Sequence, residues 1–361
     1  MTENYGYTGK ILRVDLSKEK LTIESVDSEI LRKYIGGVGL ASTILYGEVP
    51  PGVTWDNPEN RLILATGPVN GTSVPGSGSF CVVTKGPLTN GAASSQANGV
   101  FGSFLKFSGF DAIVIHGSAP KWLFLYINNG NAELREADHL KGENTWDIED
   151  KIKAELGYNE RMMSVYSIGP AGENLVKFAA LVGDRGHVAG HNGIGAVMGS
   201  KKLKAIAVSR GNLRLLVKER EKLTTLSHWM ANKYKEEDMY HWGTSKLFYS
   251  AIKAGYLPVK NLTTNIFPEY ELFCGDHYRP KLELKRSPCW ACSARHCHIV
   301  KIPDGPYAGY ICEEPDYETM AGFGPLIGQT DPWSAIMLHG TTDSLGLEGN
   351  EASWLMAMVM E

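Results

Sequence analysis

The sequence predicts an α+β protein in which a β-sheet-rich N-terminal domain precedes a mainly helical domain. Short apolar runs separated by glycine fill the chain up to Val208, whereas apolar residues at helical spacing dominate after it. This change places the domain boundary near residue 210 and gives domains 1–210 and 211–361. With 361 residues, 43% of them hydrophobic, and 40 glycines, the chain can bury large cores.

The N-terminal elements follow from local patterns. Residues 11–16 and 21–23 alternate apolar and polar side chains around a polar turn, which predicts a hairpin. Further β-rich runs of buried type predict strands at 62–65, 80–84, 112–115 and 123–127. We expect one helix among them, over 144–156, because Asn144 is a capping residue and Gly157 follows the last apolar position.

The C-terminal part is expected to be helical. Residues 219–236 carry apolar side chains at helical spacing with charges between them, and the segment from Trp333 onward is apolar and helical. The final pattern reaches Glu361 without a cap or breaker, so we expect a fragment of a longer protein.

Charge and composition exclude several classes. The net charge of −4 and the scattered basic residues disfavour nucleic-acid binding. No apolar run approaches the ~20 residues that span a bilayer, so no membrane segment is expected. Because the chain also shows no charged-then-apolar leader and is poor in cysteine, we expect it to be cytoplasmic.

Half of the six cysteines, Cys289, Cys292 and Cys297, lie within nine residues of one another. Two thiolates separated by two residues can bind one metal centre. A disulfide framework does not suit a long chain with few cysteines, and a thioredoxin-like motif does not suit the third thiol. Zinc remains an alternative, but the spacing favours an iron–sulfur cluster that needs one further ligand.

Two stretches, 67–99 and 189–202, contain more glycine than packing requires. The second matches neither a P-loop nor a dinucleotide fingerprint, because its glycine spacing differs from both. Close packing of turns is one reading of these stretches. Taken together, they favour a backbone cradle for a large phosphorylated cofactor.

Several segments, in one order along nearly the whole chain, resemble the aldehyde:ferredoxin oxidoreductase family of tungsten bis-pterin enzymes. They are residues 8–16, 35–39, 168–174, 193–208, the cysteine group and Pro315-Asp316-Tyr317-Glu318-Thr319. The resemblance implies that domain 1–210 holds a tungsten (or molybdenum) bis-molybdopterin, with an optional Mg²⁺ bridging the pterin phosphates. It also implies a [4Fe-4S] cluster on Cys289, Cys292 and Cys297, with the fourth ligand beyond residue 361.

The resemblance assigns further roles. Glu318 matches the family's active-site glutamate, a general base, and Asp343-Ser344-Leu345-Gly346-Leu347-Glu348 is similar to its D-x-x-G-L-D pterin motif. Asp343, Leu347 and Glu348 are therefore expected at the pterin, although an Asp near a helix end is ordinarily a cap.

This chain also departs from the family pattern. Ser79 and His191 stand where the family has arginines, and Gln96-Ala97-Asn98-Gly99 replaces Asn-Ser-Gly-Gly. Neutral donors or histidines would then anchor the phosphates in place of the arginines, and His187 is a further candidate for this role. The expected cofactor contacts are Ser79, Gln96, Asn98, His191, Gly193 and Gly195, besides the D-x-x-G-L-D residues. His296 falls where the family has its third cysteine, and Cys297 is preferred because an insertion is easier to accommodate than a changed ligand.

The resulting hypothesis is oxidation of a small aldehyde to a carboxylate, with electrons leaving through the cluster to ferredoxin or a ferredoxin-like iron–sulfur subunit. A homodimer is compatible with the family. One alternative is low-potential reduction of an aromatic thioester, as in benzoyl-CoA reductase. Another is a non-catalytic iron–sulfur or zinc module for electron transfer or binding.

Overall fold

The computed structural model describes residues 4–294 and 297–361. The chain divides into two compact units. Unit 1 comprises residues 1–227, 289–291 and 345–347, and unit 2 comprises 228–288, 292–344 and 348–361. Two short segments from late in the sequence therefore fold with the N-terminal unit.

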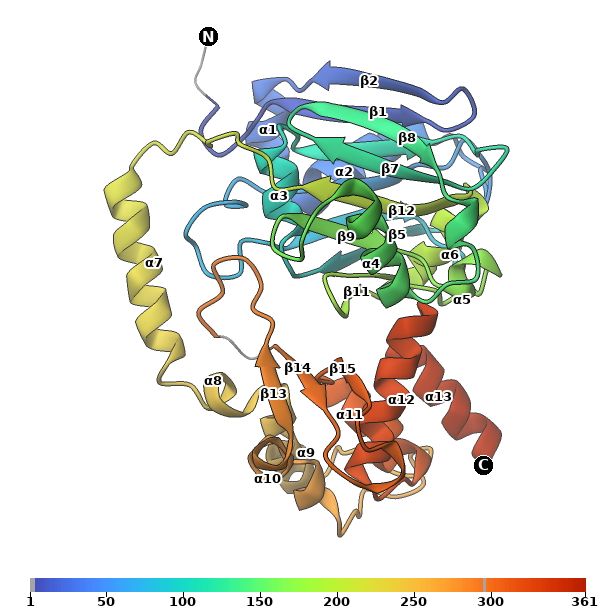
Figure 1. The fold of residues 1–361 in the computed structure, drawn as a ribbon, viewed down its shortest axis with the longest axis vertical. Helices are drawn as coiled ribbons and strands as arrows, with labels where there is room; N and C mark the ends of the chain where they lie inside the picture. The colour runs from blue at the N-terminus through green and yellow to red at the C-terminus, as the bar shows by residue number, and fades with distance from the viewer. Residues whose placement is uncertain (1–3, 295–296) are drawn as a thin grey trace. The chain divides into compact units, whose positions relative to one another are not determined.

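Unit 1 contains two six-stranded mixed sheets (Figure 1). The first has the order β2 (Lys20–Ser25), β1 (Lys10–Asp15), β6 (Ala112–His116), β3 (Leu62–Ala65), β4 (Phe80–Lys85) and β5 (Ala92–Ala97). The second has the order β11 (His187–Ala189), β10 (Leu181–Gly183), β9 (Met163–Ser167), β12 (Leu203–Ser209), β7 (Leu123–Asn128) and β8 (Asn131–Glu136). Each sheet has one parallel pair, β1 with β6 and β7 with β12.

Unit 1 also contains the helices α1 (Ser28–Tyr34), α2 (Gly37–Glu48), α3 (Phe101–Phe107), α4 (Thr145–Leu156), α5 (Pro170–Glu173) and α6 (Ile194–Ser200). Side chains of α3 and α6 enter the core between the two sheets. Side chains of α1 and α2 share a core with the first sheet, and side chains of α4 share one with the second. Unit 1 is thus layered as helix, sheet, sheet, helix.

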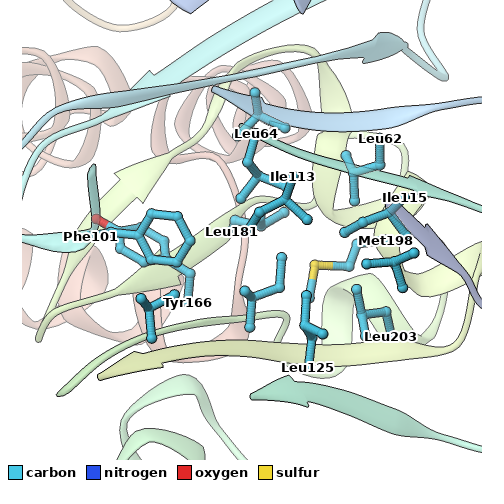
Figure 2. Close-up of a cluster of buried hydrophobic side chains, with 14 of the residues drawn as sticks. Leu62, Leu64, Phe101, Ile113, Ile115, Leu125, Tyr166, Leu181, Met198 and Leu203 are labelled. Atoms are coloured by element: carbon cyan, nitrogen blue, oxygen red, sulfur yellow. The ribbon is translucent and has the colours of Figure 1, made fainter. Parts of the chain in front are cut away.

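The largest core lies between the two sheets, where Leu64 and Ile113 of the first sheet face Leu125 and Tyr166 of the second (Figure 2). Along β3, Leu62 and Leu64 enter this core, whereas the two residues that alternate with them face the helices. Strands buried on both faces have continuous apolar sequences, which is why the predicted strand runs are confirmed.

The prediction of a single helix in this region is wrong, although α4 is confirmed with Asn144 as its N-cap and Gly157 in the left-handed conformation. The N-terminal unit contains the additional helices named above. Helix α2 has three glycines and weak intrinsic propensity, but it buries Leu40 and Leu45 against the first sheet. Tertiary packing therefore outweighs local propensity here.

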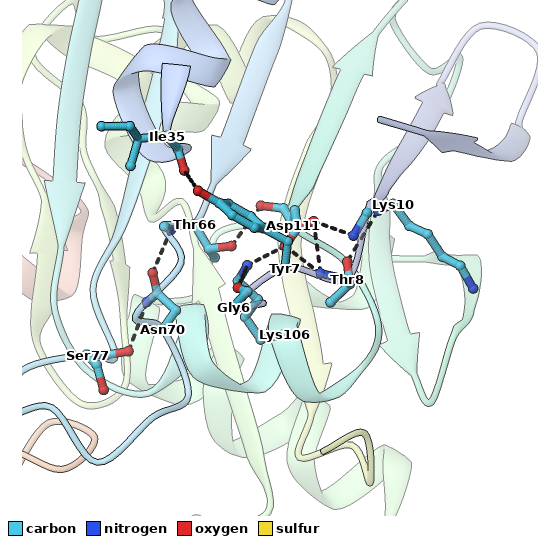
Figure 3. Close-up of polar contacts among 12 residues, drawn as sticks. Gly6, Tyr7, Thr8, Lys10, Ile35, Thr66, Asn70, Ser77, Lys106 and Asp111 are labelled. Carbon is cyan, nitrogen blue, oxygen red and sulfur yellow. Dashed lines mark hydrogen bonds and ion pairs between the residues drawn. The ribbon is translucent and has the colours of Figure 1, made fainter. Parts of the chain in front are cut away.

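A buried ion pair fixes the N-terminal segment to the first sheet (Figure 3). Lys106 pairs with Asp111, and its ammonium also donates to the Gly6 carbonyl at 3.0 Å. Asp111 in turn accepts the backbone N–H groups of Thr8 at 3.1 Å and Gly9 at 2.7 Å. Because both charges are paired and further hydrogen-bonded, they can be buried.

Unit 2 contains a three-stranded antiparallel sheet and several helices. Its strands are β13 (Glu283–Arg286), β14 (His298–Lys301) and β15 (Ile311–Glu313). Its helices are α8 (Asp238–Trp242), α9 (Leu247–Ala254), α10 (Gly275–Tyr278), α11 (Tyr317–Phe323), α12 (Pro332–Leu345) and α13 (Gly349–Met360), and α7 (Arg220–Tyr234) precedes them. The predicted α+β class is confirmed. Within the described ranges, no helix is both long and apolar enough to cross a membrane.

A buried polar network centred on Glu314 connects the sheet of unit 2 to its helices. The Glu314 carboxylate accepts from Arg279 Nε at 2.5 Å, Arg279 Nη2 at 2.9 Å and the Tyr278 hydroxyl at 2.9 Å. His298 Nδ1 lies 3.1 Å from the same carboxylate. Burial alone would raise the pKa of Glu314, but His298 and Arg279 outweigh it and hold this pKa below its usual value.

Glu314→Gln should therefore destabilise unit 2 by about 3–5 kcal/mol near neutral pH, because it leaves the Arg279 charge buried without its counter-ion. A carboxylate whose pKa is lower in the folded than in the unfolded protein stabilises the fold at pH values above its unfolded-state pKa. This contribution is lost as the pH falls through the folded-state pKa. The difference in stability between the variant and the wild type should accordingly become smaller in acid. Thermal unfolding midpoints of both proteins at several pH values measure this difference. A difference that is equal at every pH would contradict the prediction.

Candidate metal centre and cofactor site

The first part of the cysteine loop is anchored in unit 1 by Trp290. Its backbone N–H donates to the Gly99 carbonyl at 2.9 Å, and its indole Nε1 donates to the Thr72 carbonyl at 3.0 Å. The indole lies edge-on to Phe107 with 5.1 Å between ring centroids, and Arg210 lies over its ring. A large aromatic side chain with its N–H satisfied thus fixes the position of Cys289.

Gly78 makes this anchoring possible. A Cβ at position 78 would lie 2.0 Å from the Gly99 carbonyl oxygen and 2.8 Å from Trp290 Cβ. Both distances are shorter than van der Waals contact, so any side chain here would displace the loop.

We expect Gly78→Ala to lower the free energy of unfolding by about 1–3 kcal/mol, the usual cost of overpacking. The iron content predicted for the cysteine group should fall with it, because Cys289 is adjacent to the displaced Trp290. Thermal unfolding and iron analysis measure the two effects. Gly47→Ala is the matched control, since nothing lies within 4 Å of a Cβ at that position. Equal stability of the two variants would refute the close approach.

Cys289 lies beside a histidine of unit 1, and that histidine interacts with a buried aspartate. Its Sγ is 3.7 Å from His187 Nε2, and both residues are buried. Nearby, Asp184 accepts the Val100 N–H at 2.8 Å and the Ser164 hydroxyl at 2.7 Å. Desolvation, and secondly the Glu149 carboxylate, raise the pKa of Asp184 to about 6.

Cys292 and Cys297 belong to unit 2 and are partly exposed. The loop that carries them joins β13 to β14, and the Ser287 N–H donates to the Cys297 carbonyl at 3.0 Å, which extends the hairpin. His296, the residue at the family's third cysteine position, lies outside the described residues. All six cysteines are described, and none of them forms a disulfide.

Ser79 and Asn98, two of the predicted cofactor contacts, are brought together. The Ser79 hydroxyl donates to Asn98 Oδ1 at 2.7 Å, and Asn98 is also held through its carbonyl by the Tyr166 hydroxyl at 2.9 Å. Gln96 is exposed on β5. Upstream, Asn70 orders the glycine-rich segment by donating to the Ser77 carbonyl (Figure 3). It also donates to the Ser79 carbonyl.

His191 and Gly193 form the turn that precedes α6, and Gly195 lies in its first turn. A Cβ at Gly193 would lie 1.9 Å from the Lys177 carbonyl oxygen, and one at Gly195 would lie 2.6 Å from that of Ala180. Close packing therefore accounts for glycine at both positions. Their contact with a cofactor stays a prediction.

The D-x-x-G-L-E motif is divided between the units. Asp343 is buried in α12, with its Oδ2 3.4 Å from His339 Nε2. Glu348 is the N-cap of α13 and accepts the Glu351 N–H at 2.6 Å. Leu347 folds with unit 1, where it pairs with Ala179 as an isolated β-bridge. The motif therefore has a structural role, and its pterin contacts stay predictions.

Glu318 lies in the first turn of α11, which is capped by Asp316 through the Thr319 N–H at 2.9 Å. Its side chain is exposed in the described chain. Partial desolvation, followed by the Asp316 carboxylate, raises the pKa of Glu318 above its usual value. A raised pKa brings a carboxyl closer to the range in which it can exchange protons near neutral pH.

Cys312, a thiol just before the Tyr-Glu-Thr motif, is directed into the core of unit 2. The Cys312 Sγ lies 3.7 Å from the Ile336 carbonyl oxygen, and a Cβ at Gly340 would lie 2.5 Å from the Cys312 Cβ. Burial raises its pKa well above the usual value, which disfavours the thiolate form that binds metals.

Sequence reasoning missed Trp290, Gly78 and Asp184 as parts of this site. The only available signals were the aromatic residue inside the C-x-x-C motif and the acid in Gly183-Asp184-Arg185-Gly186. Both are too common to assign without knowing that the β10–β11 turn and the loop after β5 meet at Cys289.

Comparisons with known proteins define the class to which this fold belongs. The model of the aldehyde ferredoxin oxidoreductase N-terminal domain matches residues 11–210, and the model of domains 2 and 3 of the same proteins matches residues 222–361. The chain belongs to the aldehyde ferredoxin oxidoreductase family.

Relatives share this similarity over nearly the whole chain. The tungsten-containing aldehyde ferredoxin oxidoreductase of Pyrococcus furiosus is 37% identical over 99% of this chain, and that of Thermococcus kodakarensis is 36% identical. A WOR-like subunit of an aliphatic sulfonate oxidoreductase from Pyrococcus furiosus is 30% identical over 99% of the chain. The chain spans 59% of the length of each of these relatives.

Among solved structures, the active-site complex BamBC of benzoyl coenzyme A reductase with 1,5-dienoyl-CoA is similar, with a TM-score of 0.87 and 27% sequence identity. The match covers 98% of this chain and 55% of that one.

Proposed function

We propose that the complete protein is a tungsten-dependent oxidoreductase that oxidises an aldehyde to a carboxylate and passes the electrons to ferredoxin. The observation that carries the proposal is the group of three cysteines, none of them in a disulfide, whose first member is fixed by Trp290. The chain belongs to the same family as the tungsten-containing relatives. Three clustered thiols suit an iron–sulfur cluster, and a buried Cys289 suits a ligand protected from solvent.

The overall reaction converts an aldehyde and water to a carboxylate, three protons and two electrons. The tungsten pterin would supply the two-electron chemistry, and the cluster on Cys289, Cys292 and Cys297 would release the electrons singly. Ser79, Asn98 and the backbone around Gly193 would position the cofactor. The proposal extends to molybdenum in place of tungsten and to Mg²⁺ as an additional ion at the pterin phosphates.

Glu318 would accept a proton from the attacking water or the aldehyde hydrate at a carboxylate oxygen. Its raised pKa supports this role, because general bases work best when their pKa lies near the working pH. The proton would then pass to solvent, to which the side chain is exposed.

Metal content and electron flow of the complete protein, expressed anaerobically with both metals supplied, test the proposal. We expect tungsten or molybdenum, a pterin, four irons per cluster and aldehyde-dependent reduction of ferredoxin. Absence of both tungsten and molybdenum would refute it.

A second candidate, reduction of an aromatic thioester, is supported by the structural similarity to the benzoyl coenzyme A reductase complex. Thioester-dependent electron flow without aldehyde-dependent flow would favour it over aldehyde oxidation.

A further inference from the structure

His187 is held rigidly at the first thiol of the cysteine loop. It begins β11 and pairs with Gly183 of β10, so the two-stranded hairpin fixes its backbone. Its exposed fraction is 8%, and that of Cys289 is 7%. The 3.7 Å separation of Nε2 and Sγ therefore lies in a site from which water is largely excluded.

Gly99 contacts both the β10–β11 hairpin and the cysteine loop. A Cβ at Gly99 would lie 2.5 Å from Asp184 Oδ2 and 2.9 Å from His187 Cδ2, so both side chains approach its Cα closely. The Gly99 carbonyl simultaneously accepts the Trp290 N–H. Imidazole and thiol are thus fixed to the same backbone, and all of these residues belong to unit 1.

The chemistry of the pair determines which atom carries the proton. A metal-bound cysteine is a thiolate and can only accept hydrogen bonds. His187 must therefore present an N–H at Nε2 to make a favourable contact, whichever group its other nitrogen faces. Hydrogen bonds to cluster sulfurs are one of the features that set reduction potentials.

We propose that His187 donates a hydrogen bond from Nε2 to the Cys289 thiolate and so raises the reduction potential of the cluster. The inference rests on the proposed function, because it requires an iron–sulfur cluster on Cys289. Reduction adds one electron and makes the cluster and its thiolates more negative. A donor at the thiolate stabilises that form more than the oxidised one, and no proton is transferred. His187 is a positioning residue in this proposal.

Two other arrangements would place an imidazole at this distance from a thiolate. His187 could itself ligate a cluster iron, or His187 and Cys289 could share one zinc ion, whose Zn–N and Zn–S bonds of about 2.0 and 2.3 Å also allow such a separation. The experiment must distinguish both from a hydrogen bond.

The test compares the midpoint potential of the cluster in the complete protein and its variants, followed by EPR. His187→Leu removes the donor, and His187→Gln keeps an N–H on a side chain of similar reach. We expect a lower potential in His187→Leu, on the order of a tenfold change in the reduction equilibrium or about 59 mV for one electron. His187→Gln should recover most of the difference. His139→Leu, an exposed histidine of the same unit, is the control and should match wild type.

A second measurement needs no variant. In wild-type protein labelled with ¹⁵N-histidine, the reduced cluster should show a weak ¹⁵N coupling in pulsed EPR. A strong coupling would mean direct ligation, and no coupling would mean no contact, so either overturns the inference. An unchanged potential in His187→Leu with wild-type iron content also overturns it, while leaving the proposed function intact. Zinc without iron in wild-type protein would refute both.

Discussion

Glu318→Gln should reduce kcat for aldehyde oxidation by about 100- to 10,000-fold, the range that a general base contributes. Glutamine preserves the size of the side chain but cannot accept the proton at a carboxylate oxygen. The helix that carries it should be unaffected, because its cap is formed by Asp316 and not by Glu318. Steady-state reduction of ferredoxin measures the effect, with tungsten and iron content determined on the same sample.

Glu351→Gln is the matched control, because Glu351 is likewise an exposed glutamate in the first turn of a helix. It should retain wild-type kcat. Wild-type kcat in Glu318→Gln would remove this glutamate from the mechanism, whereas equal loss in both variants would indicate damage to unit 2.

Cys289→Ser should abolish most cluster binding. Serine is nearly isosteric, but its hydroxyl is a poor ligand for iron, which prefers soft thiolates. Iron content and visible absorbance should fall together, and electron transfer to ferredoxin should be lost with them.

The control for this prediction is Cys81→Ala. Cys81 is also buried in unit 1, but it lies on β4 in the core beneath α2. Its thiol pKa is raised to about 12 by burial, so it is suited to packing and not to ligation. Cys81→Ala should keep its iron. Full iron in Cys289→Ser would show that Cys289 is not a ligand.

Much of the fold could be predicted because the central strands of unit 1 are buried on both faces. Continuous apolar runs such as 62–65 and 112–115 permit few other structures, and Asn144 with Gly157 marks both ends of α4. The helices α2 and α6 could not be predicted from propensity, since Gly39 of α2 and Gly195 and Gly199 of α6 allow close packing that only the folded chain reveals.

The candidate site could likewise be predicted only in part. Spacing alone predicts the three thiols as ligands, because ligand spacing is a local property of the sequence, and this assignment stays a prediction. The groups around Cys289 come from three distant segments, and nothing local in Asp184, Gly78 or Gly99 indicates that they meet there. Gly193 and Gly195 illustrate the opposite difficulty, because packing and cofactor binding both favour glycine and the sequence does not separate them.

The two short late segments of unit 1 have a consequence for how the protein is made. The Thr72 and Gly99 carbonyls receive their partners from Trp290, and the Ala180 N–H donates to the Gly346 carbonyl. During synthesis, these three backbone groups gain their partners only when the two late segments leave the ribosome, long after the rest of unit 1. A nascent chain ending at residue 227 would lack both the segment with Cys289 and the segment with Leu347. The first thiol therefore reaches its place only after the strands of unit 1 have been synthesised, and the cluster proposed on it would be assembled late.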